Sequence, residues 1–204
     1  MLAQHTLADV EPYQQLAPYS CGAAALKAVY QHWGEHIDEP TLIREVGIDP
    51  MNGSTAQQVT DAARMRGYLA QTRTFRSIDE LGTYTAQDIP VIVAIRSFRR
   101  PDQGHFVVAT KVDPNYVEIM DPNVRGNRRT LTRSEMDRRW QFRSRIGVIV
   151  MPKRKRPQLG QDTPSTRLTS QQRTALAVAG IVVAIAATTA GIAIYRRRAA
   201  LTRA

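Results

Sequence analysis

Cys21 is the only cysteine of the chain, and the residues around it could make it a nucleophile. It stands at the start of a predicted helix, in the run Ser20-Cys21-Gly22-Ala23-Ala24-Ala25-Leu26. At a helix N-terminus, the unpaired N–H groups and the positive end of the helix dipole favour a thiolate. A lone cysteine is also commonly a small buried apolar residue, so its position alone leaves both interpretations open.

A cysteine nucleophile needs a base, and the chain has four histidines. His105 opens the predicted strand 105–111, where a stiff element would hold the ring at the rim of a sheet. His32 and His36 flank the end of the first predicted helix, where a cation suits the dipole and a structural role is expected. His5 lies in the N-terminal stretch, so His105 is the candidate base.

Asp121 is the candidate that would orient His105. It ends the predicted strand 116–120 and precedes Pro122. If strands 105–111 and 116–120 form an antiparallel hairpin through residues 113–115, His105 and Asp121 leave it side by side at the same end. An Asp-Pro pair is also a common strand terminator, so the assignment depends on the hairpin.

Gln15 completes the set of candidates. It lies six residues before Cys21, in a segment that also contains Pro18. Its amide N–H₂ and the backbone N–H of Cys21 could together stabilise an oxyanion that develops on a substrate carbonyl.

The elements that must position these residues change in type along the chain. Helix signals come first, over residues 20–33, 41–46 and 54–65, and end at Gly34, Gly47 and Gly67. Strand signals follow over residues 69–75, 90–96, 105–111, 116–120 and 146–151. Helices followed by strands indicate an α+β fold.

These motifs resemble those of the papain-like cysteine peptidases that process bacteriocin precursors at double-glycine leaders. In that family a Gln lies six residues before a Cys that opens a helix reading Cys-Gly-x-Ala-x-Leu, as Gln15 and Cys21–Leu26 do here. The resemblance covers roughly residues 11–152, and its other matching motifs are Trp33-Gly34, Gly53-Ser54-Thr55, Pro90–Val93, Gly104–Val108, Asp121-Pro122, Trp140 and Gly147–Val150.

The resemblance implies a papain-like fold with N-terminal helices packed on an antiparallel sheet, and acyl transfer from a peptide or protein substrate. It makes Cys21 the nucleophile, His105 the general base and later the acid, Asp121 the orienter of His105, and Gln15 an oxyanion donor. It implies no cofactor. The alternative is a binding module that captures a peptide on this fold without cutting it, because some relatives have lost the Cys and serve as docking domains.

The charge of the chain is concentrated at one end. The formal net charge is +10, yet residues 1–151 carry 18 basic and 17 acidic side chains, whereas residues 152–204 carry 10 basic ones and a single acidic one, Asp162. Residues 122–151 form a smaller basic stretch, for which a solvated surface is the ordinary interpretation. Because that stretch lacks aromatic-interleaved and helix-turn-helix motifs, we expect no nucleic-acid partner.

Residues 174–195 predict a membrane-spanning helix. All 22 are uncharged, which is enough to cross a hydrocarbon core of roughly 30 Å, and Arg173 and Arg196–Arg198 bound them. The sequence therefore predicts a peptidase-like domain over 1–151, a basic, proline-containing linker over 152–173, a transmembrane helix over 174–195 and a short basic tail over 196–204. The lipid bilayer would be a partner through residues 174–195.

The expected orientation of this span rests on the N-terminal sequence and on the free thiol nucleophile of the domain. The first ten residues lack the charged and apolar regions of a secretory signal, so we expect a single-pass protein whose catalytic domain is cytoplasmic. Both flanks are basic, so the positive-inside tendency also leaves the inverted orientation open. Small residues at helical spacing, Gly180, Ala184 and Thr188, would allow a homodimer through the span, and an Ala-rich helix that faces lipid is the other interpretation.

Overall fold

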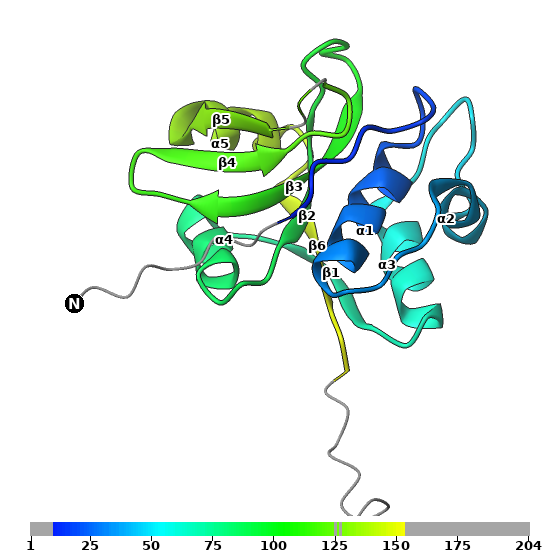
Figure 1. The fold of residues 1–204 in the computed structure, drawn as a ribbon. Coiled ribbons are helices and arrows are strands. Elements are labelled where there is room, and N and C mark those ends of the chain that lie inside the picture. Colours follow the sequence, from blue (N-terminus) through cyan, green and yellow to red (C-terminus); the bar gives the residue numbers. More distant parts are fainter. Residues whose placement is uncertain (1–9, 125, 127, 154–204) are drawn as a thin grey trace, which may run out of the picture. The chain divides into compact units, whose positions relative to one another are not determined.

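The structure, a computed structural model, describes residues 10–124, 126 and 128–153. Its helices are α1 (Cys21–His32), α2 (Glu39–Val46), α3 (Ala56–Met65), α4 (Ile78–Thr85) and α5 (Arg133–Gln141). Its strands are β1 (Leu69–Thr74), β2 (Val91–Arg96), β3 (Gly104–Val112), β4 (Tyr116–Met120), β5 (Arg128–Thr132) and β6 (Ile146–Met151). The domain is thus mixed α and β, as predicted (Figure 1).

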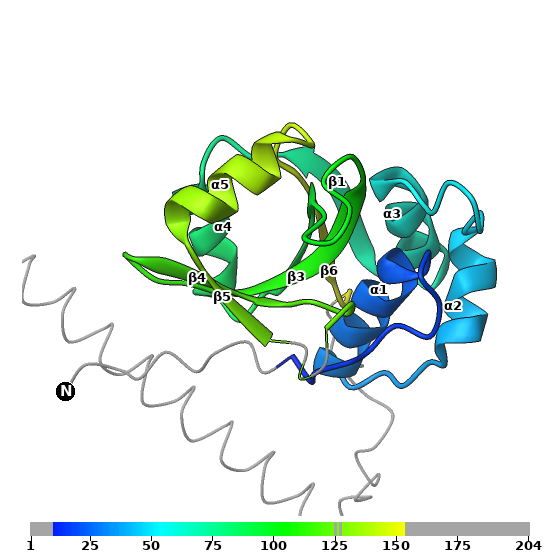
Figure 2. The same cartoon turned by 90° about the horizontal axis from the view of Figure 1, so that it is seen from above.

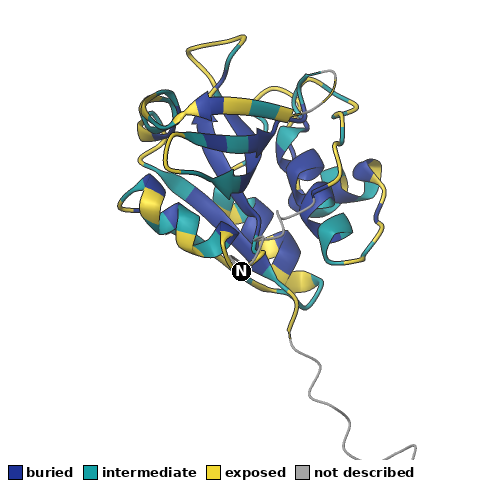
Figure 3. Ribbon diagram, turned by 60° about the vertical axis from the view of Figure 1, so that its left-hand side comes forward, coloured by how far each residue is buried: buried dark blue, intermediate teal, exposed yellow. Residues whose placement is uncertain are grey.

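The six strands form one sheet in the order β1-β6-β2-β3-β4-β5, and every pair of neighbours is antiparallel. Helices α1, α2 and α3 lie on one side of this sheet, and α4 and α5 lie on the other, within its curve (Figure 2). Because helices cover both faces, the central strands are buried on both sides, and the first five residues of β2 are all buried (Figure 3). A strand of this kind reads as a continuous apolar run, as Val91–Ile95 does.

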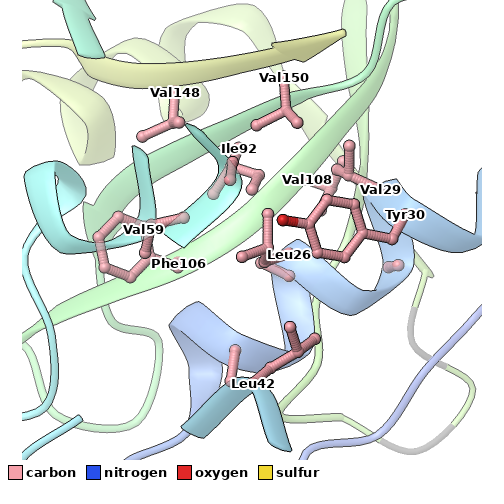
Figure 4. Close-up of a cluster of buried hydrophobic side chains, with 14 of the residues drawn as sticks. Leu26, Val29, Tyr30, Leu42, Val59, Ile92, Phe106, Val108, Val148 and Val150 are labelled. Carbon is pink, nitrogen blue, oxygen red and sulfur yellow. The ribbon is translucent and has the colours of Figure 1, made fainter. Parts of the chain in front are cut away.

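Two apolar cores follow from the alternation of side chains along the strands. In β2, Ile92 and Ala94 belong to the core beneath α1–α3, whereas Val91, Val93 and Ile95 belong to the core beneath α4 and α5. The first core joins α1 to the sheet, and Figure 4 labels among its side chains Leu26, Val29, Tyr30, Ile92, Val108, Val148 and Val150. This packing fixes the axis of α1, and with it the position of Cys21 at the helix start.

Capping side chains set the starts of α2 and α3, and both starts differ from those predicted from the sequence. Helix α2 begins at Glu39 rather than at Thr41, because the side chain of Asp38 accepts the N–H of Thr41 at 2.9 Å. Helix α3 begins at Ala56 rather than at Ser54, because Thr55 and Gln58 form a reciprocal capping box.

Three elements were not expected from the sequence: α4, β5 and α5. Each offers a weak signal. Helix α4 contains Gly82 and two threonines, and β5 carries a single buried apolar residue, Leu131. Helix α5 is strongly polar, and it is held by two buried side chains one turn apart, Met136 and Trp140.

None of the helices in the described part of the chain is long and apolar enough to cross a membrane. The predicted span over residues 174–195, its small-residue stripe, the tail over 196–204 and nearly all of the linker lie outside the described residues.

Candidate active site

Cys21 is the first residue of α1, as predicted, and is half-buried. Ser20 holds the N-cap position, but its hydroxyl does not cap the helix. The Ser20 hydroxyl instead donates to the carbonyl of Ala17 at 2.8 Å and accepts the Ala17 N–H at 3.1 Å. Within the described part of the chain, nothing accepts a hydrogen bond from the backbone N–H of Cys21, so this donor is available at the helix start.

Gly22 lets this end of α1 lie directly against its neighbours. A Cβ on Gly22 would collide with the hydroxyl of Ser54 and would lie 3.3 Å from Cγ2 of Val59 and 3.4 Å from Cδ2 of Phe106. Phe106 is the residue after His105 in β3. The absence of a side chain at position 22 therefore brings the residue after Cys21 close to the residue after His105.

His105 and Asp121 form the central pair of the site. Nε2 of His105 lies 2.6 Å from Oδ1 of Asp121, and the two residues are 6% and 1% exposed. His105 is the second residue of β3, and Asp121 directly follows β4. Strands β3 and β4 form the predicted antiparallel hairpin, with Val112 opposite Val117. The expectation that the hairpin brings the two side chains together is confirmed.

A β-bulge in β3 makes this meeting possible. The register shifts between Ala109 and Lys111, so that Val108 stands opposite Met120. Continuing that register by one residue would place Asp121 opposite Val107, two positions from His105 and therefore on the same face of the sheet. Without the extra residue, His105 and Asp121 would point to opposite faces.

Asp121 is held by three partners. Besides His105, its Oδ1 accepts the backbone N–H of Asn123 at 2.9 Å, and its Oδ2 accepts Nε–H of Arg129 at 2.7 Å. Burial by itself would raise the pKa of Asp121, but the hydrogen bond and charge of His105, with Asn123 and Arg129, lower it to about 2. Asp121 is therefore an anion at neutral pH and faces two cationic groups.

The same contacts set the charge of His105. Burial would lower the pKa of this imidazole, but hydrogen bonds to Asp121 and to the Cys21 side chain, together with the charges of both groups, raise it to about 9. Because Nε2 is taken by Asp121, Nδ1 is the ring nitrogen left for the thiol of Cys21. His105 and Asp121 are thus in direct contact, and Cys21 lines the same cleft as His105.

Cys21 and His105 line one cleft with a volume of about 370 Å³. One wall is the N-terminal segment 14–18, and another is the loop between β2 and β3, which contributes Ser97, Arg99, Arg100 and Gln103. Pro122 and Asn123 close a further side. Both the start of α1 and this loop lie at the upper end of the molecule in Figure 1.

Gln15, the predicted oxyanion donor, lines this cleft, and its amide is partly engaged. Nε2 donates to the carbonyl of Ala17 at 2.6 Å, which leaves one of the two amide hydrogens for another acceptor. Oε1 is buried and has no hydrogen-bond partner among the described residues. The backbone N–H of Gln15 donates to the carbonyl of Pro122 at 2.9 Å, which ties Gln15 to the turn that follows Asp121.

Glu39 and Arg129 support the site and were not found from the sequence. Glu39 is 1% exposed, and both of its carboxylate oxygens accept the backbone N–H of Leu16, at 3.0 and 3.2 Å. It thereby fixes the segment that carries Gln15. For Glu39, the available signal was its place in the first turn of a helix, where a carboxylate suits the dipole. Arg129 gave no distinguishing signal within the basic stretch.

The other histidines of the described chain lie elsewhere. Nε2 of His32 lies 3.0 Å from the carbonyl oxygen of Asp88, and the His32 ring packs edge-on against Trp33. His36 is not among the cleft residues, and His5 lies outside the described residues. A structural place for His32 was expected and is confirmed.

Comparison with known proteins gives concordant matches. The Lactococcin-G-processing and transport ATP-binding protein LagD of Lactococcus lactis subsp. lactis is 28% identical over 135 residues, which are 66% of this chain and 18% of that protein. The chain therefore spans less than a fifth of this relative's length.

Two solved structures share the fold. One is a double glycine motif protease from an AMS/PCAT transporter in complex with the leader peptide, with 24% identity, a TM-score of 0.60 and coverage of 74% of this chain and 96% of that one. The other is the peptidase domain of Streptococcus ComA, a bifunctional ABC transporter involved in a quorum-sensing pathway, with 20% identity, a TM-score of 0.60 and coverage of 73% and 99%. Residues 9–155 match the Peptidase C39 family, so most of the chain is accounted for by that match, and the protein belongs to this family of cysteine peptidases.

Proposed function

We propose that the chain is a cysteine peptidase that cleaves a peptide or leader sequence by acyl transfer through Cys21. The observation that carries the proposal is the 2.6 Å contact between His105 and Asp121, both nearly buried, beside Cys21 in one cleft. A nucleophile, a base and a group that orients the base are the three parts that this chemistry needs.

The reaction proceeds in two steps. The proton of the Cys21 thiol passes to Nδ1 of His105 before the substrate is attacked, which accounts for the cationic imidazole, and Sγ then attacks the carbonyl carbon of the scissile peptide bond. The C–N bond breaks, and the leaving amine takes the proton from His105, which leaves a thioester on Cys21. His105 then removes a proton from a water molecule whose oxygen attacks the thioester carbon. The C–S bond breaks, the acid leaves, and the sulfur of Cys21 recovers its proton from His105. Asp121 remains ionised and holds the ring throughout.

The negative charge that develops on the carbonyl oxygen needs donors at the start of α1. The free backbone N–H of Cys21 is one, and the second amide hydrogen of Gln15 is the other. Removing one such donor costs about 10²- to 10³-fold in kcat in related chemistry. Gln15→Ala is therefore expected to lower kcat far more than it raises KM.

A leader peptide that ends in two glycines is the proposed substrate. The support is the similarity to a structure described as a double glycine motif protease with its leader peptide, and to a lactococcin-processing relative. Glycines leave the scissile bond open to approach, which suits a cleft lined by residues 14–18 and Gly104.

The test is cleavage of synthetic precursor peptides that carry a Gly-Gly pair, followed by mass spectrometry of the products. The wild type is expected to cut after the pair, and Cys21→Ala is expected to bind the same peptide without cutting it. Binding by the wild type without any product would instead support the docking module. Cleavage that persists in Cys21→Ala would contradict the proposed nucleophile.

The proposal includes the anchor predicted over residues 174–195, with the catalytic domain on the cytoplasmic side. Its support is the sequence: 22 uncharged residues between arginines. The full chain should remain in the membrane fraction after alkaline carbonate extraction, whereas a chain that ends at residue 153 should not. Protease added outside intact cells should leave the domain whole, and its removal would establish the inverted orientation.

A further inference from the structure

The loop between β2 and β3 is organised so that two arginines stand at the cleft. Ser97 is buried, its backbone N–H donates to the carbonyl of Gln103 at 3.0 Å, and the N–H of Gln103 donates to the carbonyl of Arg100 at 2.9 Å. The Ser97 hydroxyl accepts the backbone N–H groups of Arg99 and Arg100, at 3.3 and 3.2 Å. Arg99 and Arg100 are therefore on a closed turn, and both line the cleft beside His105.

Four further guanidinium groups lie over two aromatic rings, Phe142 and Phe98, and Phe98 belongs to this loop. Arg96 and Arg143 lie over the ring of Phe142, with Cζ 4.5 and 5.0 Å from its centroid. The guanidinium of Arg143 also lies against Gly104, the residue before His105, because a Cβ there would be 2.6 Å from Nε of Arg143.

The ring of Phe98 carries a second such pair. Arg129 and Arg139 lie over it at 4.2 and 3.9 Å. Cation–π contacts of this kind offset part of the repulsion that gathering so many cations creates.

Within the described part of the chain, carboxylates pair with two of the six members of this arginine cluster, which comprises Arg96, Arg99, Arg100, Arg129, Arg139 and Arg143. Arg129 pairs with Asp121 and Arg139 with Glu135, but within the described part of the chain no carboxylate lies at ion-pair distance from the other four. The cleft lining contains no Asp or Glu, and Asp102 in the same loop is exposed and outside that lining. A substrate that enters the cleft therefore meets uncompensated positive charge.

We infer that the cleft selects peptides with acidic side chains close to the bond that is cut, bound by Arg99 and Arg100, with Arg143 adding positive charge beside Gly104. This inference rests on the proposed function, because it takes the cleft as the place where the peptide chain lies. Arginine is suited to the task, since its planar fork binds a carboxylate through two hydrogen bonds. Arg143 belongs to the basic stretch over residues 122–151, whereas Arg99 and Arg100 lie outside it.

The test uses two fluorescein-labelled peptides and the Cys21→Ala form of the full chain. One peptide has a Gly-Gly core flanked on both sides by Glu, and the other has every Glu replaced by Gln. We expect the Glu peptide to bind at least about tenfold more tightly at low salt, from several partly exposed ion pairs acting together. Raising the salt to about 1 M, where the Debye length falls to about 3 Å, should remove most of this preference.

Substitutions assign the preference to the cluster. Arg99→Gln combined with Arg100→Gln should abolish the preference, so that the Glu and Gln peptides bind this variant with equal affinity. Arg76→Gln, which removes an exposed arginine outside the cleft lining, should leave the preference intact. Equal affinity of the two peptides for Cys21→Ala would overturn the inference. A preference that survives the double substitution would overturn it too. So would a random DNA duplex that binds as tightly as the Glu peptide and no longer binds once Arg99 and Arg100 are replaced.

The failure of this inference and that of the proposed function give different results. If the wild type cuts Gly-Gly peptides with the same kcat/KM whether Glu or Gln flanks the core, the peptidase stands and the acidic preference fails. If Cys21→Ala prefers the Glu peptide but the wild type cuts neither peptide nor any Gly-Gly precursor, the preference stands and the peptidase fails.

Discussion

Replacing Asp121 by Asn should sharply lower the pKa of His105. The substitution keeps the shape of the side chain and removes the negative charge that lies 2.6 Å from Nε2 of His105. An opposite charge this close typically moves a pKa by about 1–3 pH units, which corresponds to about 1.4–4 kcal/mol. The pKa of His105 is about 9 in the intact site, so it should fall toward or below neutrality. Arg129 should also lower the pKa of His105 in this variant, because the Asp121 carboxylate would no longer balance the positive charge of its guanidinium.

The assay is a pH titration of the histidine Cε1–H resonances by NMR in the two proteins, with His105 assigned through His105→Gln. Asp137→Asn is the matched control, because it removes a carboxylate that pairs with Arg145 and should leave His105 unchanged. A pKa of His105 in Asp121→Asn within about half a pH unit of the wild-type value would refute the reasoning. It would mean that the carboxylate does not stabilise the imidazolium.

Three other predictions concern stability. Arg129→Gln should lower the free energy of unfolding in urea by about 1–3 kcal/mol, because it removes a charged hydrogen bond from the buried carboxylate of Asp121. Gly22→Ala should cost about 1–3 kcal/mol by overpacking against Ser54, and Ser54→Gly in the same chain should restore part of the loss. The folded-state pKa of His105 is raised from 6.5 to about 9. The contribution of His105 to the free energy of unfolding is therefore complete below pH 6.5 and is lost as the pH rises through about 9. Thermal melts should show that loss, and His105→Gln should remove it.

Each of these has a control in the same chain. Arg138→Gln removes an exposed arginine of α5 and should change stability by less than about 0.5 kcal/mol. If Arg129→Gln costs no more than this control, its bond to Asp121 is not stabilising. Gly34 has a positive φ, and a Cβ added there would meet no atom within 4 Å. The loss of stability in Gly34→Ala would therefore come from backbone strain and should be unaffected by Ser54→Gly. A pH slope that is equal in wild type and His105→Gln would assign that slope to other groups.

The local chemistry of the site could be predicted because its parts carry short-range signals. A cysteine at a helix start, a histidine opening a strand and an Asp-Pro ending the next strand are each visible within a few residues. The hairpin that joins the last two is also local, since only residues 113–115 lie between its strands. What could not be predicted is the bulge between Ala109 and Lys111, which decides whether His105 and Asp121 share a face.

The missed elements depend on contacts between distant segments. Helix α5 has a polar sequence, and only the burial of Met136 and Trp140 against the sheet makes it a helix of the core. Strand β5 lies at the edge of the sheet and pairs only with β4, so its sequence needs little apolar character. Arg129 lies on that strand, so its hydrogen bond to Asp121 depends on the pairing of β5 with β4.

The rate at which iodoacetamide alkylates Cys21 tests the central claim most directly. Cys21 is the only thiol of the chain, so the intact mass of the protein reports on this residue alone. The account predicts that alkylation in the folded wild type is at least about tenfold faster than in His105→Ala, because His105 removes the thiol proton. Far-UV circular dichroism should show that both proteins are folded. Equal alkylation rates in the two folded proteins would contradict the claim that His105 activates Cys21.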